Sequence, residues 1–301
     1  MAAAIPATAF GGPEVLSLTE VEVPTPGIGE VSIRVRAAGV NPSDGKMAAG
    51  MFGADPARLP LRLGSEVSGT ISAVGDGSVF EVGEDVIAYR APGGWAEEIT
   101  VAAADVFAKP EELGWDEAAG LLLAGTTAWD LVESTGVGEG ATVLVHGASG
   151  SVGIIAGQLA RLRGATVLGT ASEANARVLE DHGIEPVLYG EGLLDRVRGL
   201  GRSVDIALDA VGTDEAIDVS LALTVPGRVA SVAAFHRAGD GILLLRGGGD
   251  VRRAARPQLI ELAERGAISL PMGRTFRLRD AAAAVELVAS GHSGGKIVLR
   301  P

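Results

Sequence analysis

A glycine-rich junction between a strand-like run and a helix-like run constrains the fold of this chain more than any other feature. The junction is His146–Gly153, with glycines at positions 147, 150 and 153. It follows the apolar run Thr142–His146, and apolar residues recur at helical intervals from Val152 to Leu162. Such a turn lets backbone N–H groups approach a pyrophosphate at the positive end of a helix. It predicts a dinucleotide-binding unit, with a merely tight structural turn as the alternative.

The rest of the chain divides into three parts that differ in the order and length of their predicted strands and helices. The first third has short strand-like runs separated by Gly and Pro turns, which is typical of an all-β, barrel-like lobe. From about Leu113, strand-like and helix-like runs alternate, and this alternation predicts an α/β fold with a doubly wound parallel sheet. After about Ile268 the pieces become short again. The expected strands are 31–36, 67–71 and 85–89 in the first part, 142–146, 166–169, 186–188, 204–208 and 228–232 in the second, and 296–300 at the end.

Composition excludes several classes of function. The 301 residues include no cysteine, which rules out disulfide frameworks, thiolate zinc sites and cysteine nucleophiles. The net charge of −13 opposes binding to nucleic acid or to an anionic membrane. Residues Met1–Ile5 lack the pattern of a signal peptide, and the most apolar stretches are too interrupted to span a bilayer. We expect a globular, cytoplasmic protein that acts on a small molecule.

The end of the second predicted strand of the sheet indicates which dinucleotide binds. An NAD site normally places an acidic residue there, about 20 residues after the glycines, to bind the ribose 2′-OH. This strand ends at Ser172, a neutral donor able to face a 2′-phosphate, and Asn175 and Arg177 follow on the next helical turn. We therefore expect NADPH. NAD stays open, because a longer strand would make Glu173 the NAD acid; in the purely structural alternative Ser172 caps the helix and Glu173 pairs with Arg177.

Short motifs recur in a characteristic order and spacing along nearly the whole chain. They are Gly39–Asp44, Leu63–Gly69, Val82–Val86, Ala124–Trp129, the glycine turn, Asp209–Gly212, Gly227–Val229 and Gly295–Leu299. By these motifs the chain resembles the medium-chain dehydrogenase/reductase superfamily, and within it the zinc-independent NADPH:quinone oxidoreductase group. The resemblance implies a GroES-like catalytic domain formed by residues 1–123 and 268–301, and a Rossmann NADP-binding domain formed by residues 124–267.

The resemblance also bears on the reaction. Zinc-dependent relatives have a cysteine where this chain has Asn41 and a histidine where it has Ser65, so no zinc site is expected. Without a metal to polarise a ketone, the implied acceptor is a quinone or an α,β-unsaturated carbonyl, whose ring or β-carbon already accepts a hydride. Two alternatives stay open. One is reduction of an enoyl thioester, with Arg58, Arg62 and Arg90 as a basic rim, and the other is non-enzymatic NADPH binding.

One motif holds the expected catalytic residues. The resemblance implies that Asn41 lies near the nicotinamide and that the hydroxyl of Ser43 relays protons. Many quinone reductases have a tyrosine where this chain has Lys46, and here Lys46 is expected instead to donate a proton or anchor the enolate oxygen. Taken alone, Asn41–Asp44 is also a turn and helix-cap sequence, and Lys46 is also typical of a solvated surface. Asp44 is expected to shape the site by hydrogen bonding. No residue is expected to bind a metal, because the four histidines show no metal-ligand spacing.

The expected cofactor contacts come from both domains. Tyr189 matches a position beside the 2′-phosphate or adenine, with ordinary strand packing as the alternative, and Phe235 lies in a loop that covers the nicotinamide in relatives. The resemblance also implies a homodimer, with Leu243–Leu245 either as an edge strand that pairs across a two-fold axis or as a buried strand. The expected contacts are Asn41, Thr127, Gly147, Ser149, Gly150, Ser151, Val152, Gly153, Ser172, Asn175, Arg177, Tyr189, Val211, Phe235 and Lys296.

Overall fold

The computed structural model describes residues 1–247 and 250–301. The chain divides into two compact units, Met1–Leu123 with Pro271–Pro301, and Ala124–Leu270. The division expected from the sequence lies at 123/124 and 267/268, so the two schemes differ in residues 268–270.

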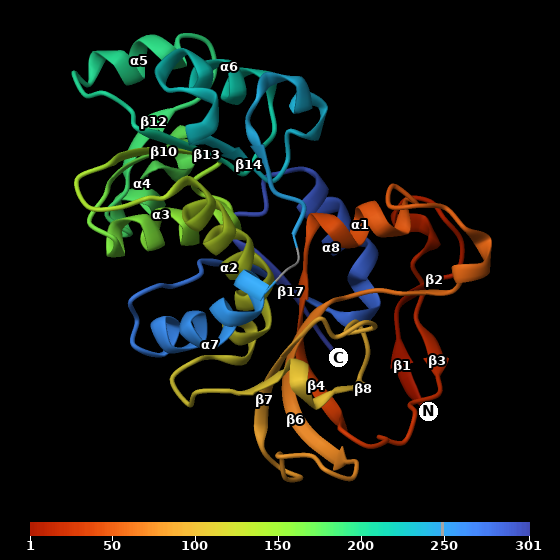
Figure 1. Ribbon diagram of the computed structural model, residues 1–301. Helices are drawn as coiled ribbons and strands as arrows, with labels where there is room; N and C mark the ends of the chain where they lie inside the picture. Colours follow the sequence, from red (N-terminus) through yellow and green to blue (C-terminus); the bar gives the residue numbers. More distant parts are fainter. Residues whose placement is uncertain (248–249) are drawn as a thin grey trace. The chain divides into compact units, whose positions relative to one another are not determined.

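The first unit is built on a seven-stranded sheet. Its order is β16-β17-β4-β6-β7-β9, and β8 pairs with β4 (Figure 1). The expected strands 31–36, 67–71 and 85–89 lie within β4, β6 and β7. The strands are β1 Ala2–Ala4, β2 Pro6–Ala7, β3 Thr19–Val21, β4 Glu30–Val40, β5 Leu61–Arg62, β6 Glu66–Val74, β7 Asp85–Tyr89, β8 Glu98–Ala102, β9 Val106–Ala108, β16 Met272–Arg277 and β17 Lys296–Arg300, and the helices are α1 Pro42–Ala48 and α8 Ala281–Ala289.

The C-terminal strand β17 determines which residues meet in this unit. β17 runs antiparallel to β4, with Ile297 opposite Val40. On the other side of β4, β6 is also antiparallel, with Val67 opposite Ala38. The residues next to these pairs therefore lie at the same end of three neighbouring strands. They are Lys296, Asn41 and Glu66.

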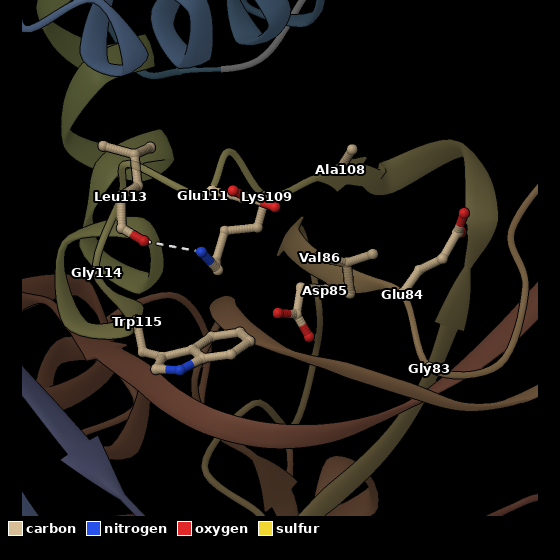
Figure 2. Close-up of a pocket in the computed structure, with 10 residues that line it drawn as sticks. All are labelled: Gly83, Glu84, Asp85, Val86, Ala108, Lys109, Glu111, Leu113, Gly114 and Trp115. Carbon is tan, nitrogen blue, oxygen red and sulfur yellow. Dashed lines mark hydrogen bonds between the residues drawn. The ribbon is translucent and has the colours of Figure 1, made fainter.

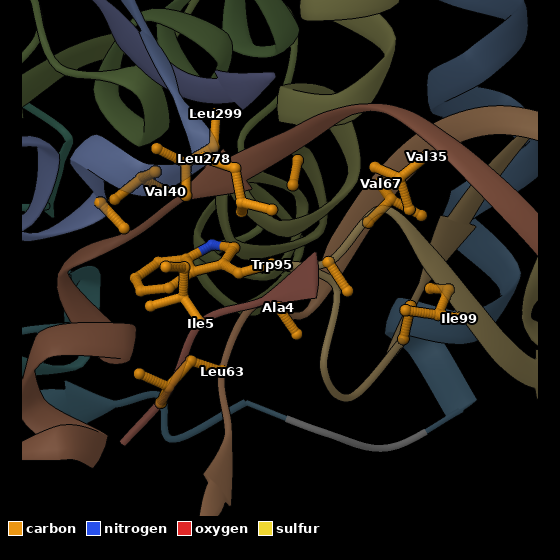
Figure 3. Packing of buried hydrophobic residues seen from close by; sticks show 14 of the residues in the cluster. Ala4, Ile5, Val35, Val40, Leu63, Val67, Trp95, Ile99, Leu278 and Leu299 are labelled. Atoms are coloured by element: carbon orange, nitrogen blue, oxygen red, sulfur yellow. The ribbon is translucent and has the colours of Figure 1, made fainter. Parts of the chain in front are cut away.

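An apolar cluster holds that end of β4 in place. Trp95 is 1% exposed, and its indole Nε1 donates a hydrogen bond of 3.1 Å to the carbonyl oxygen of Gly39. Figure 3 shows its ring beside Ile5, with Leu63 and Val40 in the same cluster. A buried Trp packs a large apolar area and uses its one donor, so it restrains the backbone two residues before Asn41.

The second unit is a doubly wound parallel sheet, as predicted. Its order is β12-β11-β10-β13-β14-β15, with every neighbouring pair parallel, which is the order of a Rossmann sheet (Figure 1). The strands are β10 Thr142–His146, β11 Thr166–Ala171, β12 Glu185–Leu188, β13 Ile206–Asp209, β14 Val229–Ser231 and β15 Leu243–Leu244. The helices are α3 Ser151–Leu162, α4 Glu173–Asp181, α5 Leu193–Gly199, α6 Asp214–Leu223 and α7 Asp250–Glu264, and α2 Trp115–Thr135 contains the 123/124 boundary.

The helix after the glycine turn ends where its sequence indicates. α3 ends at Leu162, and Gly164 has φ +81°. Glycine takes this left-handed conformation without the steric cost that a Cβ would add, so it stops the helix and lets the chain enter β11.

Candidate functional site

Three polar side chains that are far apart in the sequence meet at the end of β4, β6 and β17. Nζ of Lys296 donates to Oδ1 of Asn41 at 2.6 Å and to Oε1 of Glu66 at 2.7 Å. Nδ2 of Asn41 donates to the same Oε1 at 2.9 Å. Their exposed fractions are 5% for Asn41, 0% for Glu66 and 2% for Lys296. Buried charges persist when they are paired and hydrogen-bonded, and each charge here has a partner.

The carboxyl of Asp44 belongs to the same buried region. It lies on α1, and its Oδ2 accepts a hydrogen bond of 2.8 Å from the backbone N–H of Asn41. Burial raises the pKa of Asp44 to about 7, although the amides of Asn41 and Gly64 and the charge of Lys296 act in the opposite direction. The backbone of Asn41 thus closes the turn, while its carboxamide bonds to Glu66 and Lys296. The helix-cap interpretation therefore applies to the backbone of this segment.

The other two expected catalytic residues also lie on α1, with different exposure. Ser43 is half-buried, and Lys46 is exposed. Close to the cluster in sequence, Oγ of Ser65 is buried and has no hydrogen-bond partner among residues 1–247 and 250–301. The structure thus brings together Asn41, Asp44 and Lys296 and leaves Lys46 on the surface.

The glycine turn in the second unit presents backbone atoms. Gly147 has φ +68°, and a Cβ placed on Gly153 would lie 2.3 Å from the carbonyl oxygen of Gly147. The N–H of Ile154 makes the first bond along α3, to the carbonyl of Gly150. The amides of residues 151–153 precede that bond, so they have no partner within the helix. Together with the positive end of the helix dipole they form a cradle suited to an anion.

The end of β11 differs from the purely structural alternative. β11 ends at Ala171, and Glu173 already begins α4. Glu173 therefore does not stand at the strand end where an NAD acid would lie. The side chain of Ser172 makes no capping hydrogen bond. Ser172 thus occupies the N-cap position of α4, as the structural alternative expects, without a side-chain bond. Nε of Arg177 pairs with Oδ1 of Asp181 at 3.0 Å instead of with Glu173, so the expected ion pair is wrong.

Two further predicted contacts lie at this edge of the sheet. Nδ2 of Asn175 is 3.4 Å from Oγ of Ser149, which connects α4 to the glycine turn. Tyr189 directly follows β12, and its backbone N–H donates to the carbonyl of Ala171 at 3.3 Å. Its side chain is 53% exposed, so ordinary strand packing is the wrong interpretation.

Val211 and Phe235 follow β13 and β14. A Cβ on Gly147 would lie 2.3 Å from Cγ2 of Val211, so Val211 lies directly against the glycine turn. The carboxylate of Asp209 accepts the N–H of Val211 at 3.0 Å and positions this loop. Phe235 is half-buried, and the guanidinium of Arg246 lies 4.7 Å from its ring centroid.

Thr127 lies on the part of α2 that belongs to the second unit. Its Oγ1 accepts a hydrogen bond of 3.3 Å from Nη1 of Arg252, on α7. The same guanidinium forms an ion pair with Asp130, one turn further along α2. Arg252 is 8% exposed, so this ion pair is largely shielded from water.

The sequence alone did not identify Glu66, which bonds to Asn41 and Lys296, or Arg252, which bonds to Thr127. Glu66 lies inside the motif Leu63–Gly69, and it is the only charged residue of β6. An acidic residue directly before a predicted strand is a signal, because such a charge requires a partner where the strand is buried. Its partner Lys296 was expected only as a cofactor contact, and the pairing of β17 with β4 is what brings it near Glu66.

The histidines are not arranged as metal ligands. Within residues 1–247 and 250–301, no group of three or more His, Asp or Glu side chains could hold a metal ion. His146 is buried, its Nε2 lies 3.1 Å from Oγ of Ser220, and burial lowers its pKa to about 4. A helix long and apolar enough to cross a membrane is likewise absent from the described part of the chain.

An open pocket of about 630 Å³ in the first unit lies away from the predicted residues (Figure 2). Its lysine, Lys109, donates to the carbonyls of Pro110 and Leu113 at 2.8 Å each, and its Nζ lies 4.8 Å from the ring centroid of Trp115. The ammonium of Lys109 thus already has hydrogen-bond partners within the protein. None of the expected site residues lines this pocket.

Comparison with protein families gives two matches. Residues 27–111 match the alcohol dehydrogenase GroES-like domain, and residues 183–299 match the zinc-binding dehydrogenase family. The quinone oxidoreductase of Pseudomonas aeruginosa is 33% identical, with 100% of both chains covered. The rat synaptic vesicle membrane protein VAT-1 homolog is 37% identical over 68% of this chain, and the match spans 52% of that protein.

Solved structures agree with this placement. An NAD-dependent alcohol dehydrogenase superposes with a TM-score of 0.90 at 29% identity, covering 99% of both chains. Mycobacterial Rv1454c complexed with NADPH superposes with a TM-score of 0.88 at 32% identity, covering 100% of both. The CurK enoyl reductase superposes with a TM-score of 0.83 at 26% identity, covering 99% of both.

The parallel sheet, the glycine turn and these matches over the full length have one explanation. The chain belongs to the medium-chain dehydrogenase/reductase superfamily, and within it to the quinone oxidoreductase-like group.

Proposed function

We propose that this oxidoreductase uses NADPH to reduce a quinone or an α,β-unsaturated carbonyl, without a metal. In this proposal residues 124–267 are the NADP-binding domain, and residues 1–123 with 268–301 are the catalytic domain. The observation that carries the proposal is the backbone cradle at the start of α3, where a Cβ on Gly153 would meet the carbonyl oxygen of Gly147 at 2.3 Å. A turn this tight lets the backbone amides approach a pyrophosphate.

The preference for NADPH is supported by the end of β11. Ser172, Asn175 and Arg177 supply a hydroxyl, an amide and a guanidinium there, while Glu173 begins α4 and is not the last residue of β11. The side chain of Arg177 is 81% exposed and its ion pair with Asp181 is on the surface, so little energy is needed to turn it toward a 2′-phosphate. The exposed ring of Tyr189 lies beside the same strand end and is assigned to the adenine or the 2′-phosphate.

The residues of the first unit do not fit a catalytic zinc ion. Asn41 and Ser65 offer an amide and a hydroxyl, which are poor zinc ligands. The ammonium of Lys296 already bonds to the oxygens of Asn41 and Glu66 at 2.6 Å and 2.7 Å. A dication near this ammonium would be repelled, and the two oxygens are not available to it. We therefore derive no step through a metal.

The proposed reaction assigns distinct roles to three side chains. NADPH, when bound, supplies the hydride that the quinone ring or the β-carbon of the enone receives. Negative charge then develops on the carbonyl oxygen of the acceptor, and the carboxamide of Asn41 is assigned to donate a hydrogen bond to it. The hydroxyl of Ser43 and the ammonium of Lys46 are assigned to the proton that completes the reduction.

Steady-state oxidation of NADPH with three acceptors tests this proposal. We expect turnover with 1,4-benzoquinone or with a simple enone, and less with crotonyl-CoA. Preferred turnover of crotonyl-CoA would favour the enoyl-thioester alternative and give Arg58, Arg62 and Arg90 a role at the site. Tight NADPH binding without turnover of any acceptor would indicate a non-enzymatic binding protein and contradict the proposal.

Metal analysis tests the proposed independence from zinc. The purified protein is expected to contain no stoichiometric zinc, and incubation with EDTA is expected to leave kcat unchanged. A loss of activity on chelation that zinc restores would contradict the assignment of Lys296 as the cation of this site.

A further inference from the structure

We infer that Lys296 and Glu66 are positioning residues for Asn41: they hold its carboxamide in one orientation and polarise it toward the reacting oxygen. The inference rests on the proposed function, in which Asn41 donates a hydrogen bond to the carbonyl oxygen of the acceptor. It concerns two side chains to which neither the sequence motifs nor the comparisons assign this role.

The hydrogen bonds among the three residues allow only one orientation of the amide. Oδ1 of Asn41 accepts from Lys296, and Nδ2 donates to Glu66. A rotation of the carboxamide by half a turn would place Oδ1 against the carboxylate and Nδ2 against the ammonium. The first contact would then join two acceptors, and the second would join two donors. The orientation of Asn41 is therefore set by the order of charges around it.

The other oxygen of Glu66 holds the carboxylate itself in place. Oε2 accepts a hydrogen bond of 2.8 Å from the backbone N–H of Leu123, so both oxygens of the carboxylate are used. Oε1 receives two donors, Nζ of Lys296 and Nδ2 of Asn41. A carboxylate anchored to a helix backbone has little freedom to follow Asn41 if that residue moves, and Asn41 is restrained in turn.

One hydrogen of the Asn41 amide remains for a ligand. Nδ2 carries two hydrogens, and Glu66 is its only acceptor within residues 1–247 and 250–301. A cation bonded to Oδ1 draws electron density through the amide and strengthens the remaining N–H as a donor, and burial enhances this effect. Such a donor suits an oxygen on which charge develops during hydride transfer.

Stability alone does not account for the pair. Replacing a buried ion pair by apolar residues of similar volume is often neutral or stabilising, so the charges are not required for packing. Removing one partner is costly, because the other charge is left buried. The informative variant therefore removes both charges together.

The first experiment is the double variant Glu66→Gln/Lys296→Gln, which keeps amide groups able to hydrogen-bond. We expect kcat with the best acceptor to fall on the order of 10²-fold, as for a misplaced reacting group, while the Kd for NADPH and the thermal midpoint change little. The matched control is Asp116→Asn/Arg300→Gln, which removes an ion pair of 2.8 Å that also involves β17. The control is expected to leave kcat unchanged.

A second measurement needs no folded variant. The chain has only two asparagines, Asn41 and Asn175, so protein labelled with ¹⁵N at the asparagine side chain gives two NH₂ pairs in an NMR spectrum. We expect the Asn41 pair to show two well separated, slowly exchanging hydrogens. On addition of NADPH followed by a non-reactive carbonyl analogue, we expect one hydrogen of Asn41 to shift further while its partner, bonded to Glu66, moves little. Asn175 serves as the internal reporter of cofactor binding.

The outcomes separate this inference from the proposed function. A kcat in the double variant equal to that of the wild type overturns the inference. So does an Asn41 pair that exchanges rapidly, or one that does not respond while Asn175 reports bound NADPH. If the wild type binds NADPH but turns over no acceptor, the proposed function fails instead. If the double variant does not fold, the spectrum of the wild type decides.

Discussion

At the scale of single residues, burial changes the acid–base chemistry of Asp44. Burial raises its pKa from 3.8 to about 7, so the folded protein binds this proton more tightly than the unfolded chain. The stability that Asp44 contributes is therefore complete below its unfolded pKa and is lost as the pH rises through about 7.

The variant Asp44→Asn tests this sign. Between pH 5 and pH 7 the wild type is expected to lose about 2 kcal/mol more unfolding free energy than the variant, because only the wild type has this group to deprotonate. Urea unfolding at several pH values in that range measures both slopes. Parallel slopes for the two proteins would show that Asp44 titrates normally.

Arg177 carries the proposed preference for NADPH. We expect Arg177→Ala to raise the Kd for NADPH about tenfold and to leave the Kd for NADH nearly unchanged, because only NADPH has a 2′-phosphate for a guanidinium to bind. Fluorescence titration with each cofactor measures this. Arg202→Ala is the matched control, since Arg202 is an arginine of the same unit paired with Glu185. Equal losses for both cofactors would mean that the 2′-phosphate is recognised elsewhere.

At the scale of elements, the contact between the glycine turn and α3 depends on a missing side chain. Gly153→Ala would bring a Cβ within 2.3 Å of the carbonyl oxygen of Gly147, and that oxygen belongs to backbone that cannot rotate away. We expect a loss of about 1–3 kcal/mol in unfolding free energy and at least a tenfold weaker binding of NADPH. Gly199→Ala is the control, because a Cβ there meets no atom within 4 Å. An NADPH affinity unchanged in Gly153→Ala would argue against the cradle.

Most elements were predictable because their signals are local. The period of apolar residues placed β4, β6, β7, β10, β11 and α3 close to their observed positions, and glycine at position 164 indicated the end of α3. The end of β11 was harder to place. Both a helix start and a longer strand were compatible with Ser172 and Glu173, and in the structure Ser172 is the N-cap and Glu173 begins α4.

At the scale of the whole molecule, the edge of the parallel sheet suggests how copies associate. β15 is the last strand of that sheet, as expected of an edge strand, and its outer backbone groups have no neighbour within the described sheet. We propose that two copies pair along β15. Light scattering is expected to give a mass about twice 30.4 kDa for the wild type. Leu243→Asp/Leu244→Asp is expected to give the monomer, because charged residues oppose pairing of edge strands. A monomeric wild type would contradict this proposal.

The sequence by itself determined the class of the fold, the position of the glycine turn and the absence of cysteine ligands, because each of these depends on residues close together in the chain or on composition alone. Only the tertiary structure decided what surrounds Asn41. Lys296 lies 255 residues from Asn41 in sequence and 2.6 Å from it in space, and the antiparallel register of β17 on β4 makes this contact. No periodicity or motif encodes such a contact locally, because it arises only when the C-terminal strand joins the sheet formed by the first third of the chain.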